Sequence, residues 1–399
     1  MNNNKKDILF VMNNLHCGGA EKALISLLQT FDYSSYNVDL LLFKKEGMFL
    51  KQVPKEVNLL DEPKEYSYFD MSFSKAVLSA LKKLRLDIVW YRILFTIAYK
   101  NEKRAAIREQ KVWKHIKPTL KPLSKKYDLA IGFLEKTPNY FCVDKVDAKV
   151  KIGFVNNDYE KLEMDSSIDV TYFEKLDFIA TVSEECLEAL KRTFPKQADK
   201  CIIIGNISAP KLINKLALEA IEPLHSGLKL ITLGRLSPQK GYDLLVETAR
   251  LLKEKELDFK WYILGIGELQ NQLNQLIEKF DLQNHIVFLG LKENPYPFIK
   301  QSDIYIQPSR FEGKSLAIDE AKILHKPIIL TNFSTAKDQI TNEVNGLIVE
   351  MNPEALVDGV FRMQSDTHLK NQLIENLSHE IIGNESEIEK IYKIVDSIV

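Results

Sequence analysis

The run Pro308–Ala321 holds the side chains best suited to bind a ligand rich in hydroxyl groups. It follows an apolar, strand-like run and places Glu312 on a loop and Glu320 about two turns into the next helix. Two carboxylates at this separation can each accept hydrogen bonds from a pair of adjacent hydroxyls, one pair on a sugar and one on a ribose. An acidic helix N-terminus without a ligand is the simpler explanation for Glu312. Glu320 has apolar neighbours, which indicate an inward-facing surface.

A second candidate site is the loop Gly234–Gly241, which follows the strand-like run Lys229–Leu233 and precedes a helical pattern. Arg235 offers a planar fork of donors and Lys240 a point charge, which together complement a diphosphate. Either cation alone is better explained as a solvated surface charge. The two together, between a strand and a helix, favour an anion site.

Glycines also mark the loop after the first strand-like run, Ile8–Met12. Gly18 and Gly19 stand where helical spacing begins. Glycine lets the backbone approach a ligand closely, and the free N–H groups of a helix start attract a phosphate. An ordinary tight turn is the simpler explanation of this pair alone.

Short apolar runs alternate with amphipathic stretches, a pattern typical of parallel sheets with helices on both faces. We therefore expect an α/β protein with two doubly wound sheets of about equal size. The predicted strands are Ile8–Met12, Val38–Phe43, Leu129–Leu134, Lys151–Val155, Phe178–Val182, Cys201–Ile204, Lys229–Leu233, Lys260–Leu264, Ile286–Leu289, Ile304–Gln307, Pro327–Leu330 and Leu347–Val349.

The domain boundary is predicted at the proline- and glycine-containing segment 206–227. We expect an N-terminal domain at 1–205, a linker at 206–227 and a C-terminal domain at 228–385. A last helix, 386–399, is expected to pack back on the N-terminal domain.

Composition narrows the class of protein. The 399 residues are 45% hydrophobic and 27% charged with a net charge of −1, which excludes a disordered chain and a global attraction to nucleic acid. The four cysteines have no metal-binding spacing, so no metal site is expected. The N-terminus lacks a signal-peptide pattern and the longest apolar segment, Ile88–Tyr99, is too short to cross a bilayer. We expect a cytoplasmic protein.

The segment 72–126 interrupts the alternation with three helix-like patches and an unusual charge. It has fifteen basic and three acidic residues, a net charge of +12, so the rest of the chain carries −13. A solvated helical insertion is the simpler explanation. A basic face with aromatic residues instead suits an anionic bilayer surface, and a nucleic-acid partner has no supporting motif. The cations expected to dock are Lys100, Arg104, Arg108 and Lys111, with Trp90, Tyr91, Phe95 and Trp113 among them.

Four motifs in order resemble those of family 4 glycosyltransferases: Gly18–Glu21, Gly234–Gly241, Gly265–Glu268 and the pair Glu312 and Glu320. That family consists of retaining nucleotide-sugar enzymes with the GT-B fold, two Rossmann-like domains facing across a cleft. The run after Glu312 further resembles bacterial enzymes that build capsules, exopolysaccharides or similar glycans. The resemblance implies transfer of a sugar from a UDP-sugar to a cell-surface glycan or lipid-linked acceptor, at the inner face of the plasma membrane.

Residue by residue, the resemblance gives Arg235 and Lys240 to the donor diphosphate, Glu320 to the ribose and Glu312 to the transferred sugar. Glu312, Arg235 and Lys240 would be the catalytic residues. No metal or other cofactor is implied, because the two cations and helix ends would neutralise the diphosphate. The remaining donor-binding residues implied are Gly18, Gly19, Gly265, Leu291, Ser315 and Leu316.

One departure from the family pattern concerns the loop after Lys151–Val155, where many members have a histidine and this chain has Asn156. Asparagine can bind a sugar hydroxyl but cannot act as a base near neutral pH. His16 is a possible substitute contact. The family resemblance suggests front-face displacement, in which the leaving phosphate helps to deprotonate the acceptor. A non-catalytic glycosyltransferase-like partner, a GT-B sugar-nucleotide epimerase and a phosphorylase are the alternatives.

Overall fold

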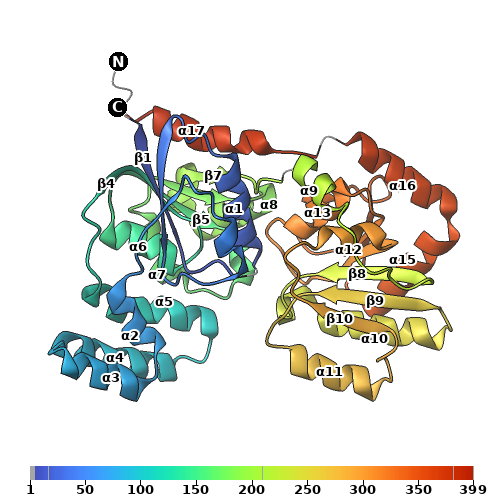
Figure 1. The fold of residues 1–399 in the computed structure, drawn as a ribbon, viewed down its shortest axis with the longest axis horizontal. Coiled ribbons are helices and arrows are strands. Elements are labelled where there is room, and N and C mark those ends of the chain that lie inside the picture. The colour runs from blue at the N-terminus through green and yellow to red at the C-terminus, as the bar shows by residue number, and fades with distance from the viewer. Residues whose placement is uncertain (1–4, 17, 209, 381, 399) are drawn as a thin grey trace. The chain divides into compact units, whose positions relative to one another are not determined.

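The computed structural model describes residues 5–16, 18–208, 210–380 and 382–398 (Figure 1). The chain divides into two compact units. The N-terminal unit holds the first strand, residues Ala20–Gly205 and the last residues from Ser386. The C-terminal unit holds Asn206–Glu385, and Gly18 and Gly19 are grouped with it.

The N-terminal unit is built on a seven-stranded parallel sheet of order β3-β2-β1-β4-β5-β6-β7. Successive connections run one way from β1 to β3 and the other way from β4 to β7, so β1 and β4 meet at a topological switch point. The strands are β1 Lys6–Met12, β2 Tyr36–Leu42, β3 Asn58–Leu59, β4 Lys126–Gly132, β5 Asp147–Val155, β6 Phe178–Thr181 and β7 Cys201–Ile203.

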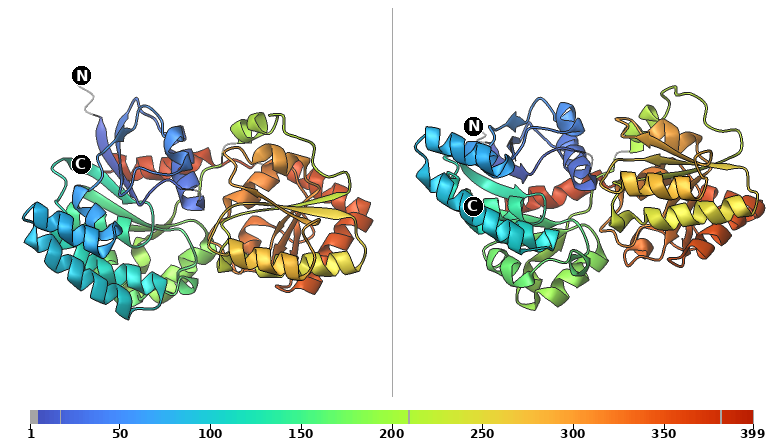
Figure 2. Two further views of the ribbon diagram at one scale, coloured as in Figure 1. Left: turned by 60° about the horizontal axis from the view of Figure 1, so that its bottom comes forward. Right: turned by 90° about the horizontal axis from the view of Figure 1, so that it is seen from below.

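Helices cover both faces of this sheet (Figures 1 and 2). The helices are α1 Gly19–Thr30, α2 Ser67–Asp70, α3 Phe73–Lys82, α4 Leu86–Asn101, α5 Ala105–Ile116, α6 Thr137–Lys145, α7 Ser166–Phe173, α8 Glu184–Thr193 and α17 Ile388–Asp396.

The last helix, α17, packs on the N-terminal unit through aromatic contacts. The Tyr392 ring stacks on Tyr36 at a centroid distance of 4.8 Å and meets Phe31 edge-on at 5.3 Å. The Tyr392 hydroxyl accepts the Asp32 backbone N–H at 2.7 Å. These contacts tie the end of the chain to the first third of the N-terminal unit.

The C-terminal unit has a six-stranded parallel sheet of order β10-β9-β8-β11-β12-β13. Its switch point lies between β8 and β11. The strands are β8 Leu228–Leu233, β9 Phe259–Leu264, β10 Ile286–Gly290, β11 Ile304–Gln307, β12 Ile328–Thr331 and β13 Leu347–Val349. The helices are α9 Pro210–Leu216, α10 Tyr242–Glu254, α11 Gln270–Lys279, α12 Tyr296–Gln301, α13 Leu316–Ile323, α14 Ala336–Gln339, α15 Pro353–Ser365 and α16 Thr367–His379.

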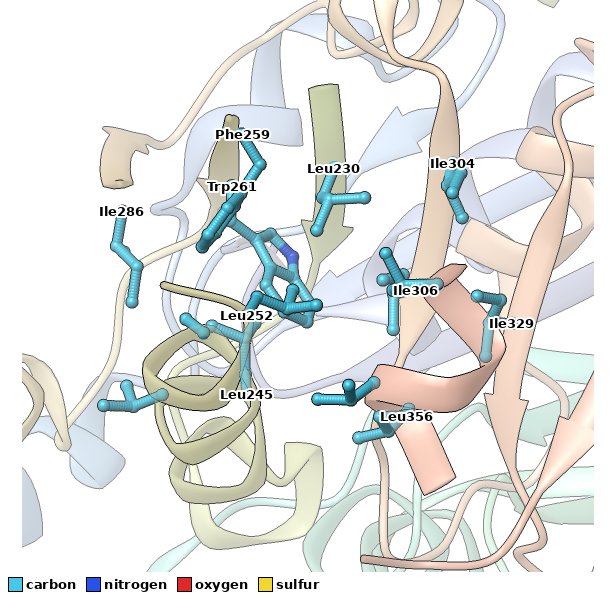
Figure 3. Close-up of a cluster of buried hydrophobic side chains, with 14 of the residues drawn as sticks. Leu230, Leu245, Leu252, Phe259, Trp261, Ile286, Ile304, Ile306, Ile329 and Leu356 are labelled. Carbon is cyan, nitrogen blue, oxygen red and sulfur yellow. The ribbon is translucent and has the colours of Figure 1, made fainter. Parts of the chain in front are cut away.

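Alternate residues of these strands enter two cores. In Figure 3, Leu230 and Trp261 point from the sheet toward Leu245 of α10, and Leu356 of α15 completes the same core. The next residue of β8, Ile231, belongs to a second core on the other face. Both faces of the sheet are therefore covered, which is why its strands are apolar throughout.

The twelve predicted strands all form, most with ends shifted by one to three residues. The structure adds β3, which is only two residues long and has no readable pattern. The segment 206–227 is not a bare linker: it contains α9, whose Ile213 is buried in the core of the C-terminal unit. Asn294 fixes the end of α9 by donating to the Leu216 carbonyl at 2.9 Å.

The three helix-like patches of 72–126 are α3, α4 and α5, but their aromatic residues do not form one exposed face. Trp113 and Phe95 are buried in the core of the N-terminal unit, and Trp90 is exposed. Of the predicted docking cations, Arg104 and Lys111 pair with Glu102 and Arg108 lies over the Tyr99 ring at 4.3 Å. One carboxylate is thus shared by two of these cations, and Lys100, Arg108 and the remaining charge of the Arg104 and Lys111 pair stay available to an anionic surface.

Candidate active site

The candidate site of the C-terminal unit lies at the carboxyl ends of its strands. The loop after β8 carries Arg235 and Lys240, and the loop after β11 carries Glu312. Since β8 and β11 are neighbours at the switch point, the two loops meet there. Ligands of open α/β sheets bind at this position.

Lys240 and Glu312 form a largely buried ion pair. The Lys240 Nζ lies 2.6 Å from Glu312 Oε1, and the Glu312 side chain is only 6% exposed. Gln307 Nε2 and the Ser309 hydroxyl donate to the same oxygen at 2.7 and 2.6 Å. Three donors thus hold one carboxylate oxygen, and this arrangement fixes the orientation of the whole group.

Backbone packing explains why the two loops meet so closely. Gly241 has a φ of +67°, and a Cβ there would lie 1.9 Å from the Pro308 carbonyl oxygen. The Gln239 carbonyl accepts the Arg310 N–H at 2.7 Å, and the Gln239 side chain donates to the Phe311 carbonyl at 2.9 Å. Only glycine at 241 allows this close contact, which in turn lets Lys240 reach Glu312.

Arg235 differs from Lys240 in both exposure and pairing. Its side chain is exposed and, within the part of the chain that the structure describes, it has neither an ion pair nor a hydrogen-bond partner. An exposed guanidinium beside a buried ion pair leaves a fork of donors for an anion. The loop therefore holds two different cations: Lys240 is paired with Glu312, and Arg235 has no partner among the described residues.

Glu320 is a second buried carboxylate, 3% exposed. It lies one turn into α13 rather than about two, because α13 begins at Leu316. The Tyr296 hydroxyl is 3.4 Å from its Oε1. Burial, and then the charges of Glu312 and Glu320, raise the pKa of Tyr305 on β11 well above its ordinary value. Both carboxylates therefore lie near the Tyr305 hydroxyl.

The Ser315 amide does not stand ready for a phosphate, which corrects an expectation from the sequence. Its N–H donates to Gln339 Oε1 at 2.8 Å, and Gln339 Nε2 donates back to the Ser315 carbonyl at 2.9 Å. Leu316, the first residue of α13, keeps the expected place at the helix start. Its N–H belongs to the helical turn that has no acceptor within the helix.

Two glycines of the site have different explanations. A Cβ at Gly265 would lie 1.9 Å from the Gly234 carbonyl oxygen, so close packing of two loops already requires this glycine. A Cβ at Gly19, the first residue of α1, would meet nothing within 4 Å. Packing therefore does not require a glycine at 19. The backbone at this helix start is open on the side where a Cβ would lie. Leu291 is 40% exposed just after β10.

The acceptor-side candidates lie at the carboxyl ends of the N-terminal sheet. Asn156 follows β5, is buried and donates to the Phe133 carbonyl at 2.9 Å, while its buried Oδ1 has no hydrogen-bond partner among the residues that the structure describes. Its backbone N–H donates to Glu135, whose carboxyl pKa is raised chiefly by complete burial. His16 follows β1, is exposed and lies 3.3 Å from Glu46 Oε1. Gly18 directly precedes α1.

Sequence reasoning missed four polar residues of these sites: Gln307, Ser309, Gln339 and Glu135. Gln307 and Ser309 carried a usable signal, because both are polar residues at the buried end of an apolar strand. Gln339 lies 24 residues after Ser315, and only the packing of α14 against α13 brings them together. Glu135 lies in an ordinary-looking loop after β4.

Comparisons with known proteins agree with this architecture. Residues 220–380 match the family model described as glycosyl transferases group 1. An N-acetylgalactosamine-N,N'-diacetylbacillosaminyl-diphospho-undecaprenol 4-alpha-N-acetylgalactosaminyltransferase of Campylobacter jejuni is 29% identical over 224 residues, covering 55% of this chain and 59% of that protein. A UDP-Gal:alpha-D-GlcNAc-diphosphoundecaprenol alpha-1,3-galactosyltransferase of Escherichia coli is 30% identical over 167 residues, 41% of this chain and 43% of that protein. The chain thus spans about half the length of these curated relatives.

Solved structures match over nearly the whole chain. A glycosyltransferase from Rickettsia africae aligns with a TM-score of 0.67 and 19% identity, covering 99% of both chains. The Anabaena protein Alr3699/HepE, solved with UDP and glucose, aligns with a TM-score of 0.68 and 16% identity, covering 98% of this chain and all of that one. The chain is therefore a relative of the group 1 glycosyl transferases through residues 220–380, and its two Rossmann-like domains give it the GT-B fold.

Proposed function

We propose that the protein is a retaining glycosyltransferase that transfers a sugar from a UDP-sugar to a cell-surface glycan or lipid-linked acceptor. The observation that carries the proposal is the pairing of Lys240 with the buried Glu312 at the switch point of the C-terminal sheet, beside Arg235, which has no partner in the described ranges. Two cations and a fixed carboxylate at this place suit a ligand that joins a diphosphate to a sugar. The UDP-sugar and undecaprenol-linked substrates in the names of relatives support the substrate classes.

The donor would be held by charge and by hydroxyl contacts. Arg235 binds the diphosphate with its fork of donors, and Lys240 adds a second charge on the side where Glu312 lies. Glu320 accepts the ribose hydroxyls from the start of α13. In Glu312, the described donors all reach Oε1, so Oε2 is the oxygen that accepts sugar hydroxyls.

The reaction that fits these residues is front-face displacement. The bond between the anomeric carbon and the diphosphate oxygen breaks, and the acceptor oxygen bonds to that carbon on the same face. The acceptor proton passes to the departing phosphate oxygen, so that UDP and the glycoside are the products. Arg235 and Lys240 stabilise the negative charge that develops on the diphosphate. Asn156 contributes a hydrogen bond to the sugar or acceptor rather than a base.

The proposed place of action is the inner face of the plasma membrane, reached from the cytoplasm. None of the helices among the described residues has the length and apolar character needed to span a bilayer. Relatives named for undecaprenol-linked acceptors support a substrate that is itself anchored in the membrane. The basic segment 72–126 lies in the same unit as Asn156 and His16, so the unit that docks would also carry the acceptor side.

Incubation of the purified chain with a panel of UDP-sugars tests the proposal. We expect slow release of UDP and free sugar for one or a few donors, and NMR of the first anomer formed should show retention. The Arg235→Ala variant is the control for background hydrolysis. Binding of UDP-sugars without turnover in the presence of lipid-linked acceptors would instead indicate a non-catalytic partner. An epimerised sugar nucleotide would indicate an epimerase, and a product of inverted configuration would contradict the mechanism.

A further inference from the structure

Helix α4 is apolar on two opposite faces. Ile88, Arg92 and Phe95 point inward and are buried in the N-terminal unit. Leu86, Trp90, Ile93 and Ile97 repeat at helical spacing on the other side and are exposed. A helix at the surface of a globular protein ordinarily has a polar outer face, so this second stripe is unpartnered apolar surface.

The apolar surface continues from α4 across the turn to α3. Leu84 in the turn is 86% exposed, Leu86 is 66% exposed and Trp90 is 59% exposed. Figures 1 and 2 show α3 and α4 side by side at the edge of the N-terminal unit. We call this surface the outer ridge; it consists of Leu78, Leu81, Leu84, Leu86, Trp90, Ile93 and Ile97. Large apolar side chains exposed on two adjacent helices are typical of an interaction site.

The charges around the outer ridge indicate what covers it. Lys75 and Lys82 on α3 and Lys100 on α4 are exposed and, within the described part of the chain, have no ion pair. The one acidic residue of the two helices, Asp87, is neutralised by Arg85 at 2.7 Å. Face-to-face contact with a second copy would bring unpaired lysines together, whereas an anionic surface would complement them.

We propose that the outer ridge inserts into the boundary between head groups and acyl chains of an anionic lipid bilayer. The apolar side chains supply the penetrating surface, and the lysines at its margins meet lipid phosphates. This rests on the membrane docking of the proposed function and adds apolar insertion to its electrostatic basis: insertion together with charge, not charge alone, anchors the N-terminal unit. The acceptor-side loops of that unit are then held at the surface where a lipid-linked substrate presents its sugar.

Trp90 is a built-in reporter for this insertion. The other two tryptophans, Trp113 and Trp261, are 1% and 0% exposed, so quenching of tryptophan emission by iodide reports on Trp90. On addition of vesicles of phosphatidylcholine and phosphatidylglycerol to the full chain, we expect a blue shift of emission, loss of iodide quenching and quenching by brominated lipid. The Trp90→Phe variant should bind vesicles while losing all three signals. No donor or acceptor is present, so failure of this test leaves the enzymatic proposal standing, and the reverse also holds.

Variants of other exposed residues provide the matched comparison. The triple variant Leu84→Asn, Leu86→Gln, Ile97→Gln should lower the vesicle partition coefficient at least about tenfold, because it removes apolar area from the inserted surface. The control, Leu218→Gln with Val344→Gln, changes exposed apolar residues of the C-terminal unit and should bind as the wild type does. Thermal unfolding of both variants at the wild-type temperature would show that neither has lost its fold.

Three results would overturn the proposal. The first is vesicle binding with unchanged iodide quenching of Trp90, which would mean docking by charge alone. The second is a blue shift that depends on protein concentration in the absence of lipid, which would mean that a second copy covers the ridge. The third is a well-folded triple variant that binds vesicles as tightly as the wild type.

Discussion

Removing Lys240 and removing Arg235 should affect stability very differently, although both cations stand in the loop after β8. Lys240 neutralises a carboxylate buried among Gln307 and Ser309, while Arg235 is exposed and unpaired within the described residues. Loss of one partner of a fully buried ion pair costs about 3–5 kcal/mol. Lys240 keeps 19% exposure and Glu312 keeps two other donors, so we expect the Lys240→Met variant to lose about 2 kcal/mol of unfolding free energy.

The assay is thermal unfolding of the ligand-free variants beside steady-state kinetics with the preferred UDP-sugar. For a domain of this size, about 2 kcal/mol corresponds to a fall in Tm of roughly 4–8 °C. The Arg235→Ala variant should unfold within about 0.5 kcal/mol of the wild type. Both variants should lose about 10²- to 10³-fold in kcat/KM, the usual effect of removing one electrostatic donor from a transition state.

The double variant Lys240→Met, Glu312→Gln separates the two effects. Replacing the carboxylate by a neutral amide removes the buried charge, so most of the lost stability should return while activity stays low. A Lys240→Met protein with the wild-type Tm, or a double variant no more stable than Lys240→Met, would refute the buried ion pair. Wild-type kcat/KM in the Arg235→Ala variant would refute its assignment to the diphosphate.

The remaining predictions concern single carboxylates. Glu320→Gln should weaken UDP binding in calorimetry, while Glu312→Gln should bind UDP normally and slow transfer; the opposite pattern would exchange the two roles. Asp169→Ala should lower the free energy of unfolding in urea by about 3 kcal/mol, because it leaves the buried hydroxyls of Tyr140 and Tyr159 without their acceptor and removes one of the two acceptors of the Gln110 amide. A loss under about 1 kcal/mol would contradict the network. Burial raises the pKa of Glu135 above 4.5, so the folded state holds this proton to higher pH than the unfolded state does. The free energy of unfolding of the wild type should therefore fall relative to that of the Glu135→Gln variant as the pH rises from about 4.5 through the folded-state pKa. If the unfolding free energies of the two proteins change in parallel with pH, the raised pKa of Glu135 is contradicted.

The fold could be predicted from the sequence because the apolar pattern that indicates each strand lies within the strand itself. Strands covered by helices on both faces must be apolar along their whole length, so runs such as Ile304–Gln307 can be recognised as strands from the sequence. The motif residues Arg235, Lys240 and Glu312 were found for a related reason, since ligand-binding loops follow directly on such strands. Strand β3 was missed because two residues are too few to show a strand pattern in the sequence.

Contacts between distant loops could not be predicted. Lys240 and Glu312 are 72 residues apart, and their pairing depends on the close approach of Gly241 to the Pro308 carbonyl. The Ser315 amide was assigned to a ligand because its acceptor, Gln339, belongs to another helix. Local spacing does not specify such partners, because they arise only when the sheet order is fixed.

The sequence determined that α4 is a helix with apolar residues, but only the tertiary structure decided which of them are covered. Ile88 and Phe95 were indistinguishable by type from Leu86 and Ile97, and Trp113 from Trp90. A helical pattern shows that two faces exist. A side chain is buried only where another part of the fold packs against it. In the described residues, the N-terminal unit packs against one face of α4 and leaves the opposite face exposed.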